Sequence, residues 1–143
     1  MRIKLAWLLG VLSVANGLFM LFAPAAWYLG IPGVASTGPF NQHFVRDIGG
    51  AYLTAGGALI WFALDVRARP AVLAAAGFFV LHALVHLGDA LGGRESWDHV
   101  MADVPTIYFS ALLTLWIAWP PSVSTTEERS NDQMAVTEAN RRV

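Results

Sequence analysis

The sequence predicts an all-α integral membrane protein, a bundle of four hydrophobic helices followed by a polar tail. Of its 143 residues, 56% are hydrophobic and 13% are charged, whereas soluble domains carry about 25% charged residues. Four apolar stretches approach the length of about 20 residues that a bilayer span requires. They cover residues 5–23, 42–64, 70–91 and 102–119. The chain is therefore expected to form one membrane domain over residues 1–121.

The first apolar stretch is followed by a long connection rich in proline and glycine. This connection carries Trp27 and Tyr28, aromatic residues that favour the headgroup region of a membrane. An alternative is that residues 1–23 form a signal peptide, with Ala23, Pro24 and Ala25 at a small-residue cleavage site. The apolar stretch is longer than the hydrophobic part of an ordinary signal peptide, which favours a retained span.

The second and third stretches are joined by residues 65–69 alone, so the two helices are expected to be antiparallel neighbours. Pro70 suits the first turn of a helix, where its missing N–H is not needed. Pro120 and Pro121 end the fourth stretch. The sequence that follows is too polar to pack, so residues 122–143 are predicted to be a disordered tail.

The basic residues predict that both termini face the cytoplasm. With four spans, seven of the nine lysines and arginines fall on one side. These are Arg2, Lys4, Arg67, Arg69, Arg129, Arg141 and Arg142. Only Arg46 and Arg94 lie toward the other side, and positive residues mark the cytoplasmic side. We therefore expect a multi-pass protein of the cell (inner) membrane.

Composition also limits the chemistry and the partners. The net charge of −1 gives no reason to expect nucleic acid as a partner. The chain has no cysteine, which excludes a disulfide framework, a thiolate zinc site and an iron–sulfur cluster. Metal or redox chemistry would have to use histidines, carboxylates or a bound cofactor.

Each predicted helix has polar or small residues spaced three or four apart, which places them on one face. On the second helix this stripe consists of His43, Arg46, Asp47, Gly50, Thr54 and Gly57. We expect such faces to point into the bundle, because charged groups in hydrocarbon cost about 2.5–3.5 kcal/mol each. At about 1.5 Å per residue, Arg46 and His86 then lie at one depth, roughly 7.5 Å inside the outer helix ends. The predicted result is a buried polar cluster near the non-cytoplasmic side, with these ligand-binding candidates: Arg46, Asp47, His86, Asp89 and Asn16.

Histidines make a metal or haem site a second hypothesis. His82 and His86 are four residues apart, a spacing that lets one helix offer two imidazoles to a metal ion. His43 is the third candidate ligand, and His43 with His86 would suit a haem held between facing helices. The alternative is that these histidines are hydrogen-bonded in a polar core or relay protons.

Several of these residues also have a purely structural interpretation. Arg46 would pair with a carboxylate in any buried position, and Asn16 would serve as an ordinary interhelical hydrogen-bonding group. Asp103 stands two residues before Pro105, as expected of a residue that caps the start of a helix. Asp98 and His99 fall in a polar connection and are expected to be solvated.

The segment Phe-Val-Arg-Asp-Ile-Gly-Gly-Ala-Tyr-Leu-Thr-Ala-Gly-Gly, residues 44–57, resembles the DoxX-like superfamily of small membrane proteins. The His-rich end of the third helix, which runs into Gly88 and Asp89, looks like uncharacterised branches of that group. The resemblance implies a four-helix membrane bundle, and some members are subunits or accessories of quinone-linked oxidoreductase systems. It implies no catalytic residues.

Three functions follow as hypotheses. The leading one is an accessory, non-catalytic membrane protein whose polar cavity binds a small ligand such as a quinone. The alternatives are a haem- or metal-dependent membrane oxidoreductase and a proton-coupled carrier of small solutes, in which paired ionisable residues would relay protons. The expected partners are the lipid membrane and either a second copy of the chain or a membrane redox protein.

Overall fold

The computed structural model describes residues 1–119 and Met134, and it is all-helical over residues 1–119. The predicted tail, residues 122–143, lies outside the described residues except for Met134. The prediction of four long apolar helices packed as a bundle is confirmed. Each helix is long and apolar enough to cross a membrane, which makes the chain a multi-pass membrane protein.

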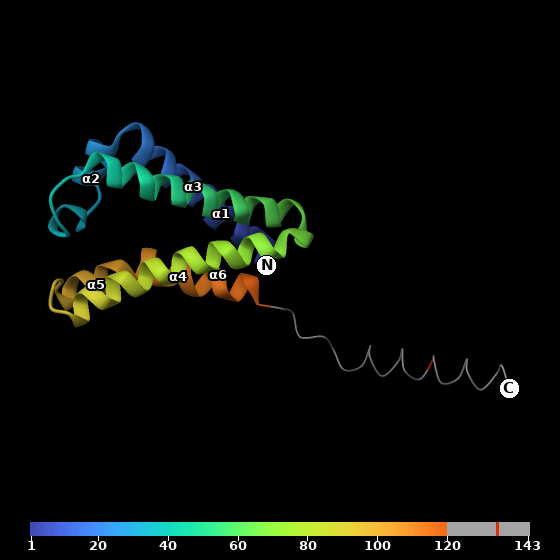
Figure 1. Ribbon diagram of the computed structural model, residues 1–143. Helices are drawn as coiled ribbons and strands as arrows, with labels where there is room; N and C mark the ends of the chain where they lie inside the picture. Colours follow the sequence, from blue (N-terminus) through green and yellow to red (C-terminus); the bar gives the residue numbers. More distant parts are fainter. Residues whose placement is uncertain (120–133, 135–143) are drawn as a thin grey trace.

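The first three membrane helices are α1 (Arg2–Phe22), α3 (Gln42–Leu64) and α4 (Arg69–Leu91). The fourth begins earlier than expected, at Trp97, and continues to Ala118. It consists of α5 (Trp97–Asp103), the π-helical turn η3 (Val104–Tyr108) and α6 (Phe109–Ala118). Short elements α2 (Pro24–Gly30) and η1 (Val34–Ser36) connect α1 to α3. In Figure 1, α1 and α3 form one layer, and α4, α5 and α6 form the other.

The layer of α1 and α3 is held together by glycines. A methyl group added to Gly17 would lie 2.6 Å from the Gly49 carbonyl oxygen, and one added to Gly56 would lie 2.8 Å from the Gly10 carbonyl oxygen. The two backbones therefore touch along a seam that leaves no room for side chains. Close approach through small residues is the usual way in which membrane helices pack.

The helices α3 and α4 are neighbours, as their short connection predicts. The Tyr52 ring of α3 packs edge-on against the rings of Phe78 and Phe79 on α4. The turn between them, η2 (Val66–Ala68), is fixed by Asp65, which accepts hydrogen bonds from the backbone N–H and the guanidinium of Arg67. The guanidinium, and then the backbone N–H, lower the pKa of the Asp65 carboxyl.

Basic residues gather at one end of the bundle. Arg2 donates a hydrogen bond to the carbonyl of Trp119, and Arg69 donates two to the carbonyl of Ala118. These contacts bring together the start of α1, the α3–α4 turn and the end of α6 (Figure 1). The elements α2, η1 and α5 lie at the opposite end, where the positive-inside rule predicts the non-cytoplasmic side.

The prediction that the polar stripe of α3 points into the bundle is wrong. His43, Arg46, Asp47, Thr54 and Gly57 are exposed. The buried face of α3 is formed instead by Val45, Gly49, Ala55, Gly56, Leu59 and Phe62. The cause is packing, because α3 contacts α1 and α4 on the side that carries Gly49, Gly56 and the large apolar residues.

Candidate metal centre

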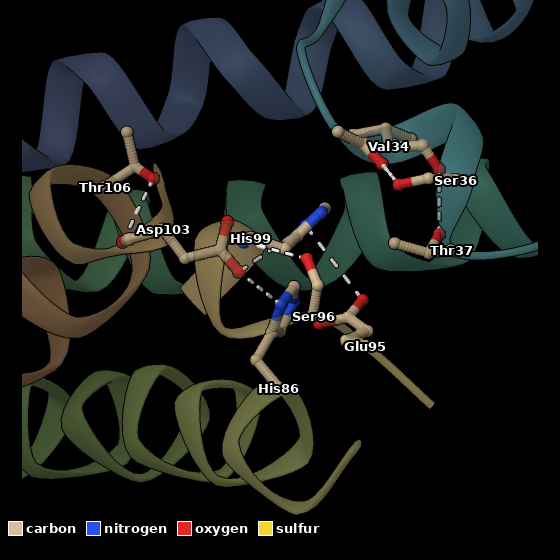
Figure 2. A network of polar contacts seen from close by, with 10 residues as sticks. Val34, Ser36, Thr37, His86, Glu95, Ser96, His99, Asp103 and Thr106 are labelled. Carbon is tan, nitrogen blue, oxygen red and sulfur yellow. Dashed lines mark hydrogen bonds and ion pairs between the residues drawn. The ribbon is translucent and has the colours of Figure 1, made fainter. Parts of the chain in front are cut away.

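Four ionisable side chains gather where α4 ends and α5 begins: His86, Glu95, His99 and Asp103 (Figure 2). One potential ligand atom from each lies within 4.8 Å of the others. We call these four residues the tetrad. It combines two imidazoles and two carboxylates at the end of the bundle opposite the basic one.

The sequence around α5 explains how three members of the tetrad come together. Ser96 caps α5, because its hydroxyl oxygen accepts a hydrogen bond from the backbone N–H of His99. His99 and Asp103 are four apart, so they lie on one side of this helix. Glu95 stands just before the Ser96 cap, with its carboxylate 4.0 Å from His99. The α4–α5 turn, in which Gly93 has a φ of 70°, folds that side back against the last turns of α4, where His86 lies.

Asp103 stands at the centre of the tetrad. Its Oδ2 atom lies 2.8 Å from His86 Nδ1 and 3.7 Å from His99 Nε2, and His99 Nε2 lies 4.0 Å from Glu95 Oε1. The four side chains are largely shielded, with exposed fractions of 18% for His86, 14% for His99, 13% for Asp103 and 9% for Glu95. The Asp103 carboxylate thus orients both imidazoles in a site partly removed from water.

The Glu95 carboxylate contains a fully buried oxygen atom, Oε2, without a hydrogen-bond partner among the described residues. A buried charged oxygen without a partner costs free energy, more than a neutral group would. A cation bound between the four side chains would remove this cost.

The connection before α3 closes over the tetrad. Gly33 has a φ of 88°, and a methyl group added to it would lie 2.5 Å from His99 Cε1. Only glycine combines this left-handed backbone with so close a contact. Figure 2 shows Val34, Ser36 and Thr37 of this connection beside the tetrad, with both hydroxyls bonded to carbonyls of their own segment. The hydroxyls therefore hold the loop in place over His99.

The chemistry and spacing of the tetrad suit a divalent transition metal. Zinc is held by histidine nitrogens and carboxylate oxygens at about 2.0–2.2 Å in a tetrahedron, which corresponds to roughly 3.3 Å between ligand atoms. The three separations of 2.8, 3.7 and 4.0 Å lie on both sides of that value. Shifts of less than about 1 Å would bring these atoms to the tetrahedral spacing, with a metal bond replacing the contact between His86 and Asp103.

Of the predicted ligand-binding residues, only His86 belongs to the tetrad. Arg46 donates from Nε to the Leu21 carbonyl. Asp47 lies 3.3 Å from His43, with both side chains mostly exposed. The single buried cluster expected from helix register does not form here, because the stripe of α3 faces outward.

The other two predicted ligand-binding residues also have separate partners. Asp89 pairs with Arg94 at 2.7 Å. Asn16 accepts a hydrogen bond from Trp27 Nε1 and lies 3.6 Å from the Met20 sulfur. Both therefore make local contacts that tie adjoining segments together.

Of the three predicted metal ligands, His82 and His86 are neighbours on α4, and His43 lies apart from them. His82 lies one turn before His86, with their ring centres 4.9 Å apart, and its ring stacks on Phe78. It adjoins the tetrad but is not a member of it. His43 lies at the start of α3 with Asp47, also outside the tetrad.

Sequence reasoning missed Glu95, His99 and Asp103 as candidate ligands. The interpretation of Asp103 as a helix cap is wrong, because Ser96 caps α5 and Asp103 is the last residue of that helix. The expectation that His99 is solvated is also wrong, since its side chain is 14% exposed. The spacing of Glu95, His99 and Asp103, each four residues after the last, was the available signal.

Comparisons with family models, with curated proteins and with solved structures found no match for this chain. The chain is a small multi-pass membrane protein with a cluster of histidines and carboxylates at one end of its bundle. Its function must therefore be inferred from this structure.

Proposed function

We propose that this membrane protein binds one divalent transition-metal cation of the zinc class through the tetrad. The observation that carries the proposal is the buried Oε2 atom of Glu95, which has no hydrogen-bond partner among the described residues. It belongs to a carboxylate that gathers with two imidazoles and a second carboxylate, one ligand atom of each lying within 4.8 Å of the others. Each of these groups is a known type of zinc ligand.

Charge balance supports a cation at this position. With both carboxylates ionised and both histidines neutral, the tetrad carries two negative charges in a largely shielded place. A divalent cation would neutralise these two charges. Its bonds to the carboxylates would also replace the hydration that the carboxylates lose when they are buried. The ligand set contains nitrogen and oxygen donors only, which suits zinc better than soft copper(I), whose preferred ligands are sulfur atoms.

The number of protein ligands favours a binding role over catalysis. Catalytic zinc sites keep one coordination position open for water or substrate, whereas closed sites use four protein ligands. The tetrad supplies four. An accessory role in the membrane, as the DoxX-like resemblance implies, agrees with such a closed site on the predicted non-cytoplasmic side.

The quinone-binding hypothesis loses its geometric basis. It required Arg46, Asp47, His86 and Asp89 around one cavity, and these residues have separate partners. The haem hypothesis required His43 and His86 to face each other, and each instead lies beside a different aspartate. The expectation of a metal site, made for His43, His82 and His86, is replaced by a binding site on the tetrad, which shares only His86 with that set.

Metal content of the protein purified in detergent tests the proposal. After removal of bound metal with a chelator and addition of zinc, we expect one zinc ion per chain by elemental analysis. Asp103→Asn should weaken zinc binding at least tenfold, because Asp103 contacts both imidazoles. Asp47→Asn is the matched control, since Asp47 also lies beside a histidine but is 61% exposed. Equal zinc affinity of the two variants, or no zinc in the unmodified protein, would overturn the proposal.

A second variant separates metal binding from folding. Glu95→Gln removes a buried charge, so the metal-free variant should be as stable as the unmodified protein or more stable. With zinc present, the order should reverse, because the amide is a poorer ligand than the carboxylate. Thermal unfolding with and without zinc measures this crossover, and a zinc-independent difference would contradict a ligand role for Glu95.

A further inference from the structure

The helix α3 carries two lines of glycine, and only one of them is packed against another element of residues 1–119. Gly49 and Gly56 face α1, where added methyl groups would lie 2.9 Å and 2.8 Å from atoms of that helix. Gly50 and Gly57, the next residue in each case, have nothing within 4 Å of an added methyl group. The second line repeats the seven-residue spacing of the first on the outward side of α3.

Gly50 and Gly57 lower the stability of the helix α3, and contacts within residues 1–119 do not explain why glycine stands at these two positions. Glycine within a helix is roughly 0.8–1.0 kcal/mol less favourable than alanine. In membranes, small residues four apart let a second helix approach closely. Thr54 lies exposed between the two glycines, and its hydroxyl is satisfied by the Gly50 carbonyl at 3.0 Å. Gly50, Thr54 and Gly57 thus present a smooth surface suited to another helix.

Charged residues continue this surface toward the outer end of α3. Arg46 and Asp47 are exposed, although they lie about 6–8 Å along a helix that starts at Gln42. Charged side chains in a membrane helix almost always face protein or water, because lipid does not solvate them. The outward face formed by His43, Arg46, Asp47, Gly50, Thr54 and Gly57, of which Gly50 is half-buried and the others are exposed, is called the α3 outer face below.

We propose that the α3 outer face is the interface with a second copy of this chain, related by a twofold axis along the membrane normal. Around the helix, Arg46 lies about 40° to one side of Gly50, and Asp47 lies about 60° to the other side. A twofold axis brings opposite edges of the two helices together. Arg46 of one copy then faces the partner's Asp47, and the reverse pair forms on the other edge.

This self-complementary charge favours a second copy over an unrelated protein. One surface supplies both the cation and the anion at nearly the same depth. Arg46 Nε is already bonded to the Leu21 carbonyl and Asp47 lies beside His43, so the pair across the interface would use the terminal nitrogens of the Arg46 guanidinium and the exposed Asp47 carboxylate. The axis also keeps both copies in the same orientation in the membrane, which an axis lying in the membrane plane would not. The interface and the tetrad are formed by different residues, so the proposal does not depend on metal binding.

Cysteine cross-linking in native membranes tests this interface, and the natural chain contains no cysteine that would interfere. Thr54→Cys should form a covalent dimer on oxidation with copper phenanthroline. Leu81→Cys is the control at a comparable depth on α4, where the side chain is 66% exposed. Equal dimer yields from the two variants would overturn the proposal. Cross-linking of Thr54→Cys to a polypeptide of different mass would also overturn it.

Two further variants, each combined with Thr54→Cys, identify the contacts. Gly57→Leu should reduce the dimer yield at least fivefold, and the open space at Gly57 means that the fold itself accommodates the larger side chain. Arg46→Glu should reduce the yield similarly, and adding Asp47→Arg in the same chain should restore it. A yield unchanged by Gly57→Leu, or no recovery in the double charge reversal, would contradict the proposed arrangement.

Discussion

The glycine seam between α1 and α3 and the tetrad between α4 and α5 bring helices together by opposite means. At the seam, Gly17 and Gly49 have no side chains, and the two backbones touch. At the tetrad, four polar side chains fill the space between the elements, and Asp103 links two of them at 2.8 and 3.7 Å.

The two regions differ in whether their contacts are complete. At the seam, the added methyl groups of Gly10, Gly17, Gly49 and Gly56 would all lie within 3.0 Å of atoms of the opposite helix, so the two helices fill the space between them. The tetrad contains a buried oxygen of Glu95 without a partner among the described residues. Substitutions at the seam should therefore change stability without changing metal affinity, whereas substitutions at the tetrad should change metal affinity and should change stability in a zinc-dependent way.

Gly17→Ala should have the largest effect on stability. Its methyl group would lie 2.6 Å from the Gly49 carbonyl oxygen and 3.0 Å from the Leu53 backbone nitrogen, and neither backbone atom can move aside alone. Overpacking of this kind costs about 1–3 kcal/mol. Thermal unfolding in detergent measures the effect, with Gly77→Ala on α4 as the control in open space. Equal melting temperatures, or zinc loss from the folded Gly17→Ala protein, would remove the contrast between the two regions.

The bundle could be predicted from the sequence because span length and apolar composition determine it. The inward face of α3 could not be predicted in the same way. Gly49 and Gly50 are equally small, and the sequence alone does not indicate which of the two touches α1. Placing the polar stripe inward assumed that α3 has no neighbour outside its own chain, an assumption that a second copy would remove.

The tetrad was only partly predictable. The spacing of His82 and His86 pointed to the right part of α4, and His86 is a member of the tetrad. Asp103 was misassigned because Pro105 normally marks the start of a helix. Here the helix continues through Pro105 as the π-helical turn η3, a wider turn that tolerates local disruption of the regular hydrogen bonds. The residues before the proline therefore extend the fourth span, and this extension carries His99 and Asp103 to the tetrad.

Gly33→Ala should have the next largest effect, because Gly33 is where the first helix pair touches the tetrad. A left-handed backbone costs an alanine about 1–2 kcal/mol, and the new methyl group would overlap His99. The loop should move away from His99, admit water to the tetrad and weaken zinc binding several-fold. Gly30→Ala, in open space nearby, is the control. Unchanged zinc affinity in Gly33→Ala would show that the loop does not shape the tetrad.

Ser96→Ala should have the smallest effect, confined to the tetrad. Losing the hydroxyl that caps α5 costs about 1 kcal/mol, which corresponds to roughly fivefold in an equilibrium constant. Because the bond joins Ser96 to the backbone of His99, fraying of this turn displaces a ligand and lowers zinc affinity by up to that factor. Ser96→Thr retains a capping oxygen and should restore most of the affinity. If threonine and alanine give the same zinc affinity in competition titrations, the cap does not position His99, and the helix geometry of α5 alone must do so.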